Sequence, residues 1–233
     1  MNEQANETNA GTPRDSAYTL WAVYRRDPAA HTALAADGGT RLAETLAEVS
    51  ARGVTVRGIY DVSGLRADAD LMLWLHGSAA DLLQQALRDL RRTPWLQPLL
   101  PTWNAMGLHR EAEFARDHVP AFLRGEHARN WLSVYPFVRS YDWYVLPAEE
   151  RKALLSEHGR KGAAFKSVMT NTVAAFSLGD YEWILPFEAD DLADLVELVR
   201  DLRATGARLH VREETPFYTG RRIEVGEIAE VLR

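Results

Sequence analysis

The apolar positions in residues 17–110 form short runs and helical stripes that predict a fixed order of elements. Residues 18–24 (YTLWAVY), 54–60 (VTVRGIY) and 70–76 (DLMLWLH) are rich in apolar, aromatic and β-branched side chains, which favours strands. Apolar side chains at helical spacing predict helices over residues 41–52, before Gly53, and over residues 79–92, before Thr93 and Pro94. A strand over residues 102–109 completes the predicted order β-α-β-β-α-β.

The second part of the chain repeats this order. Its pattern predicts strands over residues 131–138, 167–178, 181–187 and 208–218, and helices over residues 147–165 and 189–203. Residues 88–93 (RDLRRT), at the end of one predicted helix, recur as residues 200–205 (RDLRAT) at the end of another. The shared order and the shared letters predict an α+β fold in which a ferredoxin-like β-α-β-β-α-β unit is duplicated.

These units divide the chain into four segments. Residues 1–16 (MNEQANETNAGTPRDS) are polar, contain no apolar signal-peptide core, and predict a disordered N-terminal tail. Residues 17–110 form the first ferredoxin-like half, residues 131–233 form the second, and residues 111–130 form a charged, helix-prone connector. No apolar run reaches the roughly 18 residues that a membrane span needs, so we expect a cytoplasmic protein.

The charge balance and the missing cysteine narrow the possible chemistry. The chain has 33 acidic and 27 basic residues, with no stretch that concentrates the basic ones, which argues against nucleic-acid binding. The absence of cysteine excludes disulfides, iron–sulfur clusters, thiolate-bound zinc or haem, and cysteine nucleophiles. The seven histidines form no HExxH or HxH pattern, so a multi-histidine metal cage has little support. Haem is still allowed, because the porphyrin itself supplies most of the iron ligands.

Two histidines are candidates for iron chemistry, and each also has an ordinary structural interpretation. His158 lies in a predicted helix with Leu154 and Leu155 on its face, so it is either a core or helix-terminal histidine or an axial iron ligand. His118, in the connector sequence RDHVP, is either a surface loop residue or a neutral base that accepts a proton from peroxide.

Tyr135 is the third candidate. Alternation along residues 131–139 places Tyr135, Phe137 and Arg139 on one face of a predicted strand. A tyrosine in this position is most often half-buried in a sheet. The alternative is that Tyr135 and Arg139 together hold a carboxylate, and that the phenol gives up an electron and a proton beside high-valent iron. Trp143 and Tyr144 follow within one short turn.

The residues around these candidates resemble a known family. Residues 109–124 (HREAEFARDHVPAFLR), 134–146 (VYPFVRSYDWYVL) and 154–162 (LLSEHGRKG) are similar to the coproheme decarboxylases of the chlorite-dismutase-like haem superfamily. The chain is most similar to the actinobacterial branch that contains a distal histidine. The similarity runs from about residue 18 to the C-terminus and includes residues 200–220 (RDLRATGARLHVREETPFYTG). Its most specific parts are the YPxxR strand and the HG helix.

The resemblance implies a fold, an assembly and a reaction. The two ferredoxin-like halves would form a β-barrel with helices outside, and the chains would assemble as a homopentamer. Hydrogen peroxide would drive oxidative decarboxylation of two propionates of iron coproporphyrin III (coproheme), which is both substrate and redox centre. The products would be haem b and carbon dioxide. A transient contact with the coproporphyrin ferrochelatase is implied as well.

The resemblance also implies roles for six residues. His158 matches the proximal iron ligand, Tyr135 the redox tyrosine, His118 the distal base, Arg139 the residue that holds a propionate, and Trp143 and Arg208 pocket positions. In the implied mechanism, His118 takes a proton from peroxide. Tyr135 becomes a radical and removes a hydrogen from the β-carbon of a propionate before carbon dioxide leaves.

Three other functions remain open. A chlorite dismutase would share the fold and His158, but that chemistry in the family uses a distal arginine on the strand after the proximal helix, and residues 167–180 (SVMTNTVAAFSLGD) contain none. A non-catalytic haem-binding or haem-transfer protein would need His158 without Tyr135 or His118. A dye-decolourising-type peroxidase has a related fold, but its signature motifs are not found in the sequence.

Overall fold

The computed structural model describes residues 17–29, 34–109 and 119–233. The predicted tail (1–16) and the first part of the predicted connector, including His118, lie outside these ranges. The first half has the predicted elements in the predicted order: β1 (Tyr18–Arg25), α1 (Gly38–Ala51), β2 (Thr55–Asp61), β3 (Leu71–Gly77), α2 (Ala80–Arg91) and β4 (Leu100–Leu108).

The second half follows the same order with two corrections. Its elements are η1 (Ala121–Leu123), β5 (Trp131–Arg139), η2 (Trp143–Val145), α3 (Ala148–Gly162), β6 (Met169–Thr170), β7 (Val173–Ala174), β8 (Trp183–Ala189), α4 (Leu192–Leu202), η3 (Gly206–His210), β9 (Val211–Glu213), β10 (Tyr218–Ile223), η4 (Val225–Glu227) and α5 (Ile228–Val231). The single strand predicted over residues 167–178 is wrong, because it divides at Asn171, whose buried side chain bonds to Phe122 and Glu188. The strand predicted over residues 208–218 is also wrong. That segment starts as the η3 turn and is interrupted before β10 at Pro216, which has no N–H for a strand ladder.

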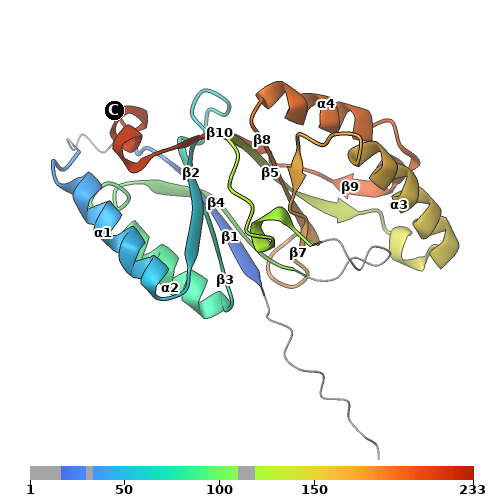
Figure 1. Ribbon diagram of the computed structural model, residues 1–233, viewed down its shortest axis with the longest axis horizontal. Helices are drawn as coiled ribbons and strands as arrows, with labels where there is room; N and C mark the ends of the chain where they lie inside the picture. Colours follow the sequence, from blue (N-terminus) through green and yellow to red (C-terminus); the bar gives the residue numbers. More distant parts are fainter. Residues whose placement is uncertain (1–16, 30–33, 110–118) are drawn as a thin grey trace, which may run out of the picture.

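The strands form one closed sheet. The order around the ring is β4-β1-β3-β2-β10-β5-β8-β7, and β7 pairs with β4 to close it. Each half supplies its strands in the ferredoxin-like order, and the edge strands of the two halves pair with each other: β2 with β10, and β4 with β7. The prediction of duplicated ferredoxin-like units forming a β-barrel with outer helices is therefore confirmed (Figure 1).

Both joins between the halves depend on a glycine that allows close approach. A Cβ atom at Gly220 of β10 would lie 2.7 Å from the carbonyl oxygen of Asp61 in β2. A Cβ atom at Gly107 of β4 would lie 2.2 Å from Cγ2 of Val173 in β7. Any larger residue would push the paired strands apart, so these glycines let the barrel close.

The threonine that ends the two similar segments, which share five of six letters, has the same structural use in both halves. The Thr93 hydroxyl, just after α2, donates to the carbonyl oxygen of Leu90 at 2.6 Å. The Thr205 hydroxyl, just after α4, donates to the carbonyl oxygen of Leu202 at 2.9 Å. Each hydroxyl satisfies a carbonyl that the end of its helix leaves without an intrahelical partner, which supports the duplication.

The described residues form three hydrophobic cores inside and around the barrel. The interior core includes Trp21 and Trp74, whose ring centroids are 5.4 Å apart. A second core lies between the sheet of the first half and the helices α1 and α2, and a third lies between the sheet of the second half and α4. Figure 1 shows α1 and α2 on one side of the barrel and α3 and α4 on the other.

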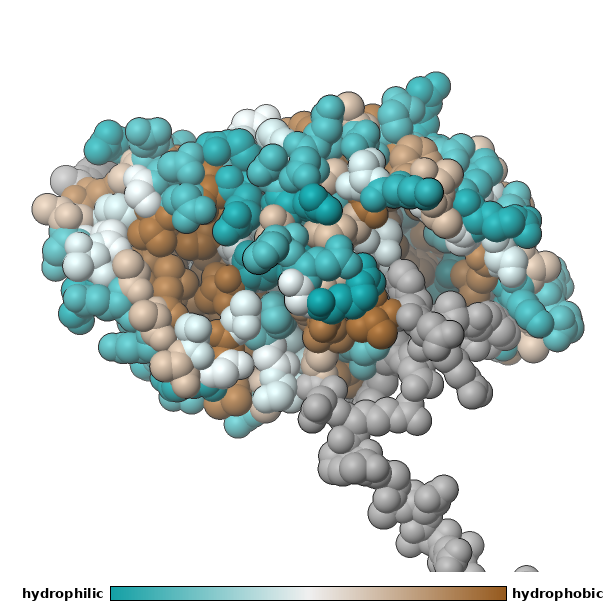
Figure 2. Space-filling model, in the orientation of Figure 1, coloured by the Kyte–Doolittle hydropathy of each residue, from teal (hydrophilic) through white to brown (hydrophobic). Residues whose placement is uncertain are grey.

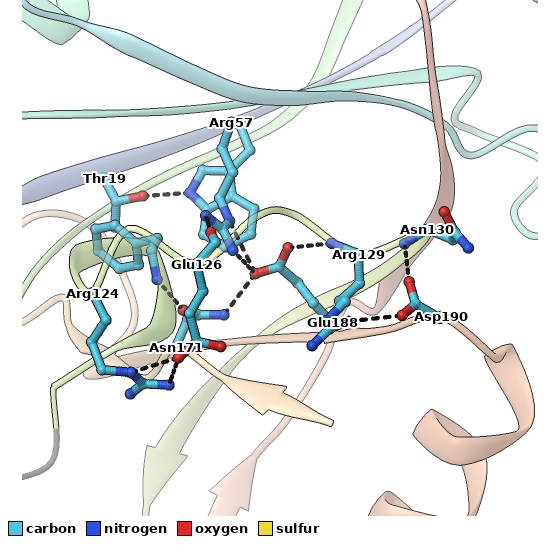
Figure 3. Close-up of polar contacts among 11 residues, drawn as sticks. Thr19, Arg57, Arg124, Glu126, Arg129, Asn130, Asn171, Glu188 and Asp190 are labelled. Carbon is cyan, nitrogen blue, oxygen red and sulfur yellow. Dashed lines mark hydrogen bonds and ion pairs between the residues drawn. The ribbon is translucent and has the colours of Figure 1, made fainter. Parts of the chain in front are cut away.

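A buried ion pair joins the two halves to the described part of the connector (Figure 3). The carboxylate of Glu188, in β8, accepts hydrogen bonds from Nε and Nη2 of Arg57, in β2, at 3.0 and 2.8 Å. It also accepts bonds from the side chain of Asn171 at 3.0 Å and from the backbone of Arg129 at 3.2 Å. Arg57 donates in addition to the carbonyl oxygen of Glu126 at 2.8 Å. Burial raises the pKa of Glu188, and the Arg57 guanidinium acts against this shift.

Hydrophilic residues cover most of the face drawn in Figure 2, and apolar residues gather on its left side, over the elements of the first half. The described helices are short, and α3, with 15 residues, is rich in charged side chains. Within residues 17–29, 34–109 and 119–233, no helix has both the length and the apolar character needed to cross a membrane.

Candidate functional site

A cavity of about 240 Å³ lies between the sheet of the second half and the helices α3 and α4. It exists because the two helices pack differently. Helix α4 packs on the sheet through Leu195, Leu198 and Leu202, whereas α3 buries none of its 15 residues. Space therefore remains beneath α3, and Leu155 and His158 from this helix line it.

The outer face of β5 forms one wall of the cavity. Tyr135, Phe137 and Arg139 all line it, as the alternation along this strand predicts. The Arg139 guanidinium lies 4.0 Å from the ring centroid of Trp143 and 4.8 Å from that of Phe137. Residues four apart on a strand are separated by about 13 Å, so Tyr135 and Arg139 face different parts of the cavity.

Tyr135 is held between aromatic rings. Its side chain is 2% exposed and stacks on Phe217, with ring centroids 4.2 Å apart and an interplanar angle of 19°. Phe187 meets it edge-on at 5.7 Å. Burial raises the pKa of the Tyr135 phenol well above its ordinary value, and the carboxylate of Glu214 adds to this shift. The phenol therefore keeps its hydrogen at neutral pH.

His158 faces the cavity from α3 and is half-buried. Its Nδ1 atom lies 3.5 Å from the hydroxyl oxygen of Thr205, the threonine that closes α4. Nε2 is therefore the ring nitrogen left for a ligand. Burial lowers the pKa of His158, and the positive charge of Arg139 lowers it further. The imidazole is neutral near pH 7, which is the form that binds metals.

A cluster of three charged side chains forms another wall. The Glu214 carboxylate accepts a hydrogen bond from Nη1 of Arg203 at 2.6 Å, and its second oxygen accepts one from Nη1 of Arg208. The Glu214 side chain is 13% exposed. Arg203 and Glu214 are absent from the sequence prediction, which pairs neither of them with another residue. Period-two alternation along the strand predicted over residues 208–218 places Glu214 on the same face as Arg208, and this is the available signal.

A second network lies beside Arg139. The Tyr144 hydroxyl donates to Oε2 of Glu182 at 2.8 Å and accepts a bond from the indole Nε1 of Trp183 at 3.2 Å. The same Glu182 oxygen accepts the backbone N–H of Arg139 at 2.8 Å. Burial raises the pKa of Tyr144 to about 12. Trp143, which lies under Arg139, is 3% exposed.

Five of the six residues singled out from the sequence therefore line one cavity: Tyr135, Arg139, Trp143, His158 and Arg208. The sixth, His118, lies outside the described residues. The stretches that supply the five are far apart along the chain, and the fold of the second half alone brings them together.

The donor set of the cavity suits a flat, apolar ligand that carries carboxylates and a metal needing one protein ligand. Aromatic and aliphatic side chains make up most of the lining. Arg139, Arg203 and Arg208 supply guanidinium groups, which bind carboxylates in a planar, two-point geometry. His158 supplies a neutral nitrogen donor. Iron porphyrins with propionate side chains have this combination of features.

Comparisons with known proteins agree with this geometry. The family model for chlorite dismutase matches residues 35–223. The coproheme decarboxylase of Mycolicibacterium smegmatis is 52% identical over 216 residues, which cover 92% of this chain and 94% of that protein. The structure of chlorite dismutase from Candidatus Nitrospira defluvii in complex with imidazole is similar, with a TM-score of 0.75 and 23% identity over 93% of this chain and 94% of that one. A cyanide complex of a variant of that enzyme has a TM-score of 0.75 and 22% identity, over 93% of this chain and 95% of that one.

Proposed function

The chain belongs to the chlorite dismutase family, and we propose that it is a coproheme decarboxylase. It converts coproheme to haem b by peroxide-dependent oxidative decarboxylation of two propionates. One observation carries this proposal: a buried phenol, a neutral imidazole and three guanidinium groups line the same cavity. The 52% identity to the coproheme decarboxylase of Mycolicibacterium smegmatis supports it.

Each described residue has a separate task. Coproheme is the substrate, and its iron supplies the chemistry with peroxide once the substrate is bound. His158 holds the iron through its neutral imidazole. Arg139 and Arg208 bind propionates at different parts of the cavity, and Trp143 supports the guanidinium of Arg139 by a cation–π contact.

Tyr135 carries out the hydrogen transfer. Like any tyrosine it is protonated at neutral pH, and the burial that raises its pKa reinforces this state, so the phenol has a hydrogen atom to lose. After giving that atom to the peroxide-oxidised substrate, Tyr135 removes one from the β-carbon of a neighbouring propionate. The propionate then passes one further electron to the oxidised substrate iron and loses its carboxylate as carbon dioxide. In each round a propionate, one hydrogen peroxide and one proton give a vinyl group, one carbon dioxide and two waters. Two rounds convert coproheme to haem b.

The remaining parts of the proposal rest on the resemblance to the family. His118 takes the proton from peroxide and acts as the distal base. The chain forms a homopentamer in the cytoplasm and contacts the coproporphyrin ferrochelatase transiently. The proposed segment boundaries are a tail over residues 1–16, a first half over residues 17–110, a connector over residues 111–130 and a second half over residues 131–233.

The test is to load the purified protein with ferric coproheme, titrate it with hydrogen peroxide and follow the porphyrin by mass spectrometry. We expect a three-propionate intermediate followed by haem b. Bleaching of the pigment without these two products would refute the decarboxylase proposal. Removing the imidazole in His158→Ala is expected to change the haem spectrum, and an unaltered spectrum would place the iron ligand elsewhere.

The role of Tyr135 is tested separately. Tyr135→Phe keeps the stacked ring but has no phenolic hydrogen, so it is expected to bind coproheme normally and to produce no haem b. Tyr141→Phe is the matched control, because the Tyr141 side chain is 83% exposed and does not line the cavity. Full turnover by Tyr135→Phe would show that another residue transfers the hydrogen.

A further inference from the structure

Glu214 is the one carboxylate among the described residues that line the cavity. Both of its oxygens are engaged, one by Arg203 and the other by Arg208. Its side chain is 13% exposed, while those of Arg203 and Arg208 are 35% and 40% exposed. A negative charge therefore lies deep in the wall of a cavity whose other charged groups are cationic.

The cluster of Arg203, Arg208 and Glu214 belongs to the part of the cavity near Tyr135. Glu214 lies in the short segment between β9 and β10, and Phe217 in the same segment stacks on the Tyr135 ring. Arg139, in contrast, lies against Trp143. A propionate whose β-carbon lies beside Tyr135 therefore has its carboxylate closer to Arg203 and Arg208 than to Arg139.

Resting on the proposed function, we propose that Glu214 is a resident counter-carboxylate that occupies Arg203 and Arg208 until a propionate of the substrate replaces it beside Tyr135. Arginine binds the carboxylate of a glutamate and that of a propionate through the same planar contacts, so the two compete for the same guanidinium groups. Two carboxylates crowded onto one cation pair repel each other, which drives Glu214 aside when the propionate arrives. Arg203 thereby becomes a substrate-binding residue together with Arg208.

This exchange discriminates between substrate and product. Coproheme brings four carboxylates, and the propionate next to Tyr135 is one of those that the reaction removes. Once that propionate has become a vinyl group, nothing on the porphyrin competes for the two arginines, and Glu214 takes them back. Glu214 therefore weakens the binding of coproheme but leaves the binding of haem b unaffected.

The experiment compares the affinities of the full-length protein for ferric coproheme and for ferric haem b, without peroxide, from the Soret absorbance. Glu214→Gln keeps the shape of the side chain and removes its charge. We expect it to bind coproheme about tenfold more tightly, the effect of one charged hydrogen bond, with no change for haem b. Glu213→Gln is the control, because Glu213 is the exposed neighbour and does not line the cavity. Arg203→Gln is expected to weaken coproheme binding about tenfold, again without an effect on haem b.

An unchanged ratio of the two affinities in Glu214→Gln, or weaker coproheme binding, would overturn the exchange. Arg203→Gln decides the same question independently if Glu214→Gln does not fold, since equal losses for both porphyrins would also overturn it. If the wild-type protein binds neither porphyrin, the proposed function fails and this inference fails with it. Normal binding by the wild-type protein with no shift in either variant refutes this inference alone.

Discussion

The outer layers of the two halves are built from matching elements but are packed differently. In the first half, α1 and α2 close over the sheet, and Leu42 of α1 and Leu90 of α2 are fully buried in the core between them and the strands. In the second half, α4 packs on the sheet, whereas α3 buries none of its residues and leaves a cavity. The duplication thus gives one layer filled by apolar side chains of both helices, with a separate cavity of about 250 Å³ where α1 borders β2 and β10, and one layer with a cavity beneath α3.

This difference shows how a repeated fold can divide stability from chemistry. The filled layer removes apolar surface from water, which is the main source of stability. The open layer buries less apolar surface, because α3 does not pack tightly on the sheet. As a result, His158 of α3 faces a cavity instead of a core. Two carboxylates of the second half differ in a similar way. Glu188 is buried and bound by Arg57 and Asn171 inside the molecule, while Glu214 and its arginines face the cavity.

The largest expected effect comes from a pair of leucines that occupy equivalent places in the repeat, Leu90 and Leu202. Leu90→Ala is expected to lower the free energy of unfolding by about 2–5 kcal/mol, because Leu90 is fully enclosed and truncation leaves a void. Leu202 already borders the cavity, so Leu202→Ala removes fewer contacts and is expected to cost about 2 kcal/mol, at the low end of the same range. Urea denaturation of both variants gives the comparison. Equal losses would mean that the two layers are equally well packed.

The sequence predicts the first half well because three of its four strands are compact apolar runs and each of its helices has a clear stripe and stop. It also contains the signal for the open layer, since the predicted helix around His158 offers little more than Leu154 and Leu155 for packing. The hydrophobic pattern does not predict how the barrel closes. Closure depends on contacts such as those of Gly107 with Val173, which join segments far apart in the chain and leave no local pattern.

The charged wall of the cavity was predicted only in part. The alternation of residues 208–218 places Glu214 on the face of Arg208, although the segment is not a continuous strand, because Gly206 begins a 3-10 turn and Pro216 interrupts the ladder. The contact of Glu214 with Arg203 joins this segment to the end of α4 and leaves no local pattern. The ion pair between Arg57 and Glu188 has the same difficulty, because only the assembled barrel brings these two residues together.

The next effect concerns a histidine inside the packed half. Burial lowers the pKa of His76 from 6.5 to about 4, and the charge of Arg57 adds to the shift. Between these two pH values the unfolded chain binds a proton at His76 and the folded chain does not. The free energy of unfolding therefore falls as the pH drops from about 6.5 to about 4. The loss from this group is at most about 3 kcal/mol. Carboxylates titrate in the same range, so the measurement is the difference between the wild-type protein and His76→Gln in urea unfolding at several pH values. A variant with the same pH slope as the wild-type protein would show that His76 protonates normally in the fold.

The smallest expected effect concerns the N-terminal cap of α4, the helix that packs on the sheet next to the loosely packed α3. Asp191 accepts the backbone N–H of Ala193 at 2.9 Å, whereas α1, α2 and α3 begin without a side-chain cap. Asp191→Ala is therefore expected to cost about 1 kcal/mol of unfolding free energy. Glu197→Ala, on the exposed face of the same helix, is the control and is expected to cost less than about 0.5 kcal/mol. If both variants unfold like the wild-type protein, packing through residues such as Leu198 holds α4 without help from its cap. If only Asp191→Ala is destabilised, the open half depends on the start of α4 for the wall that carries Arg203 and faces His158.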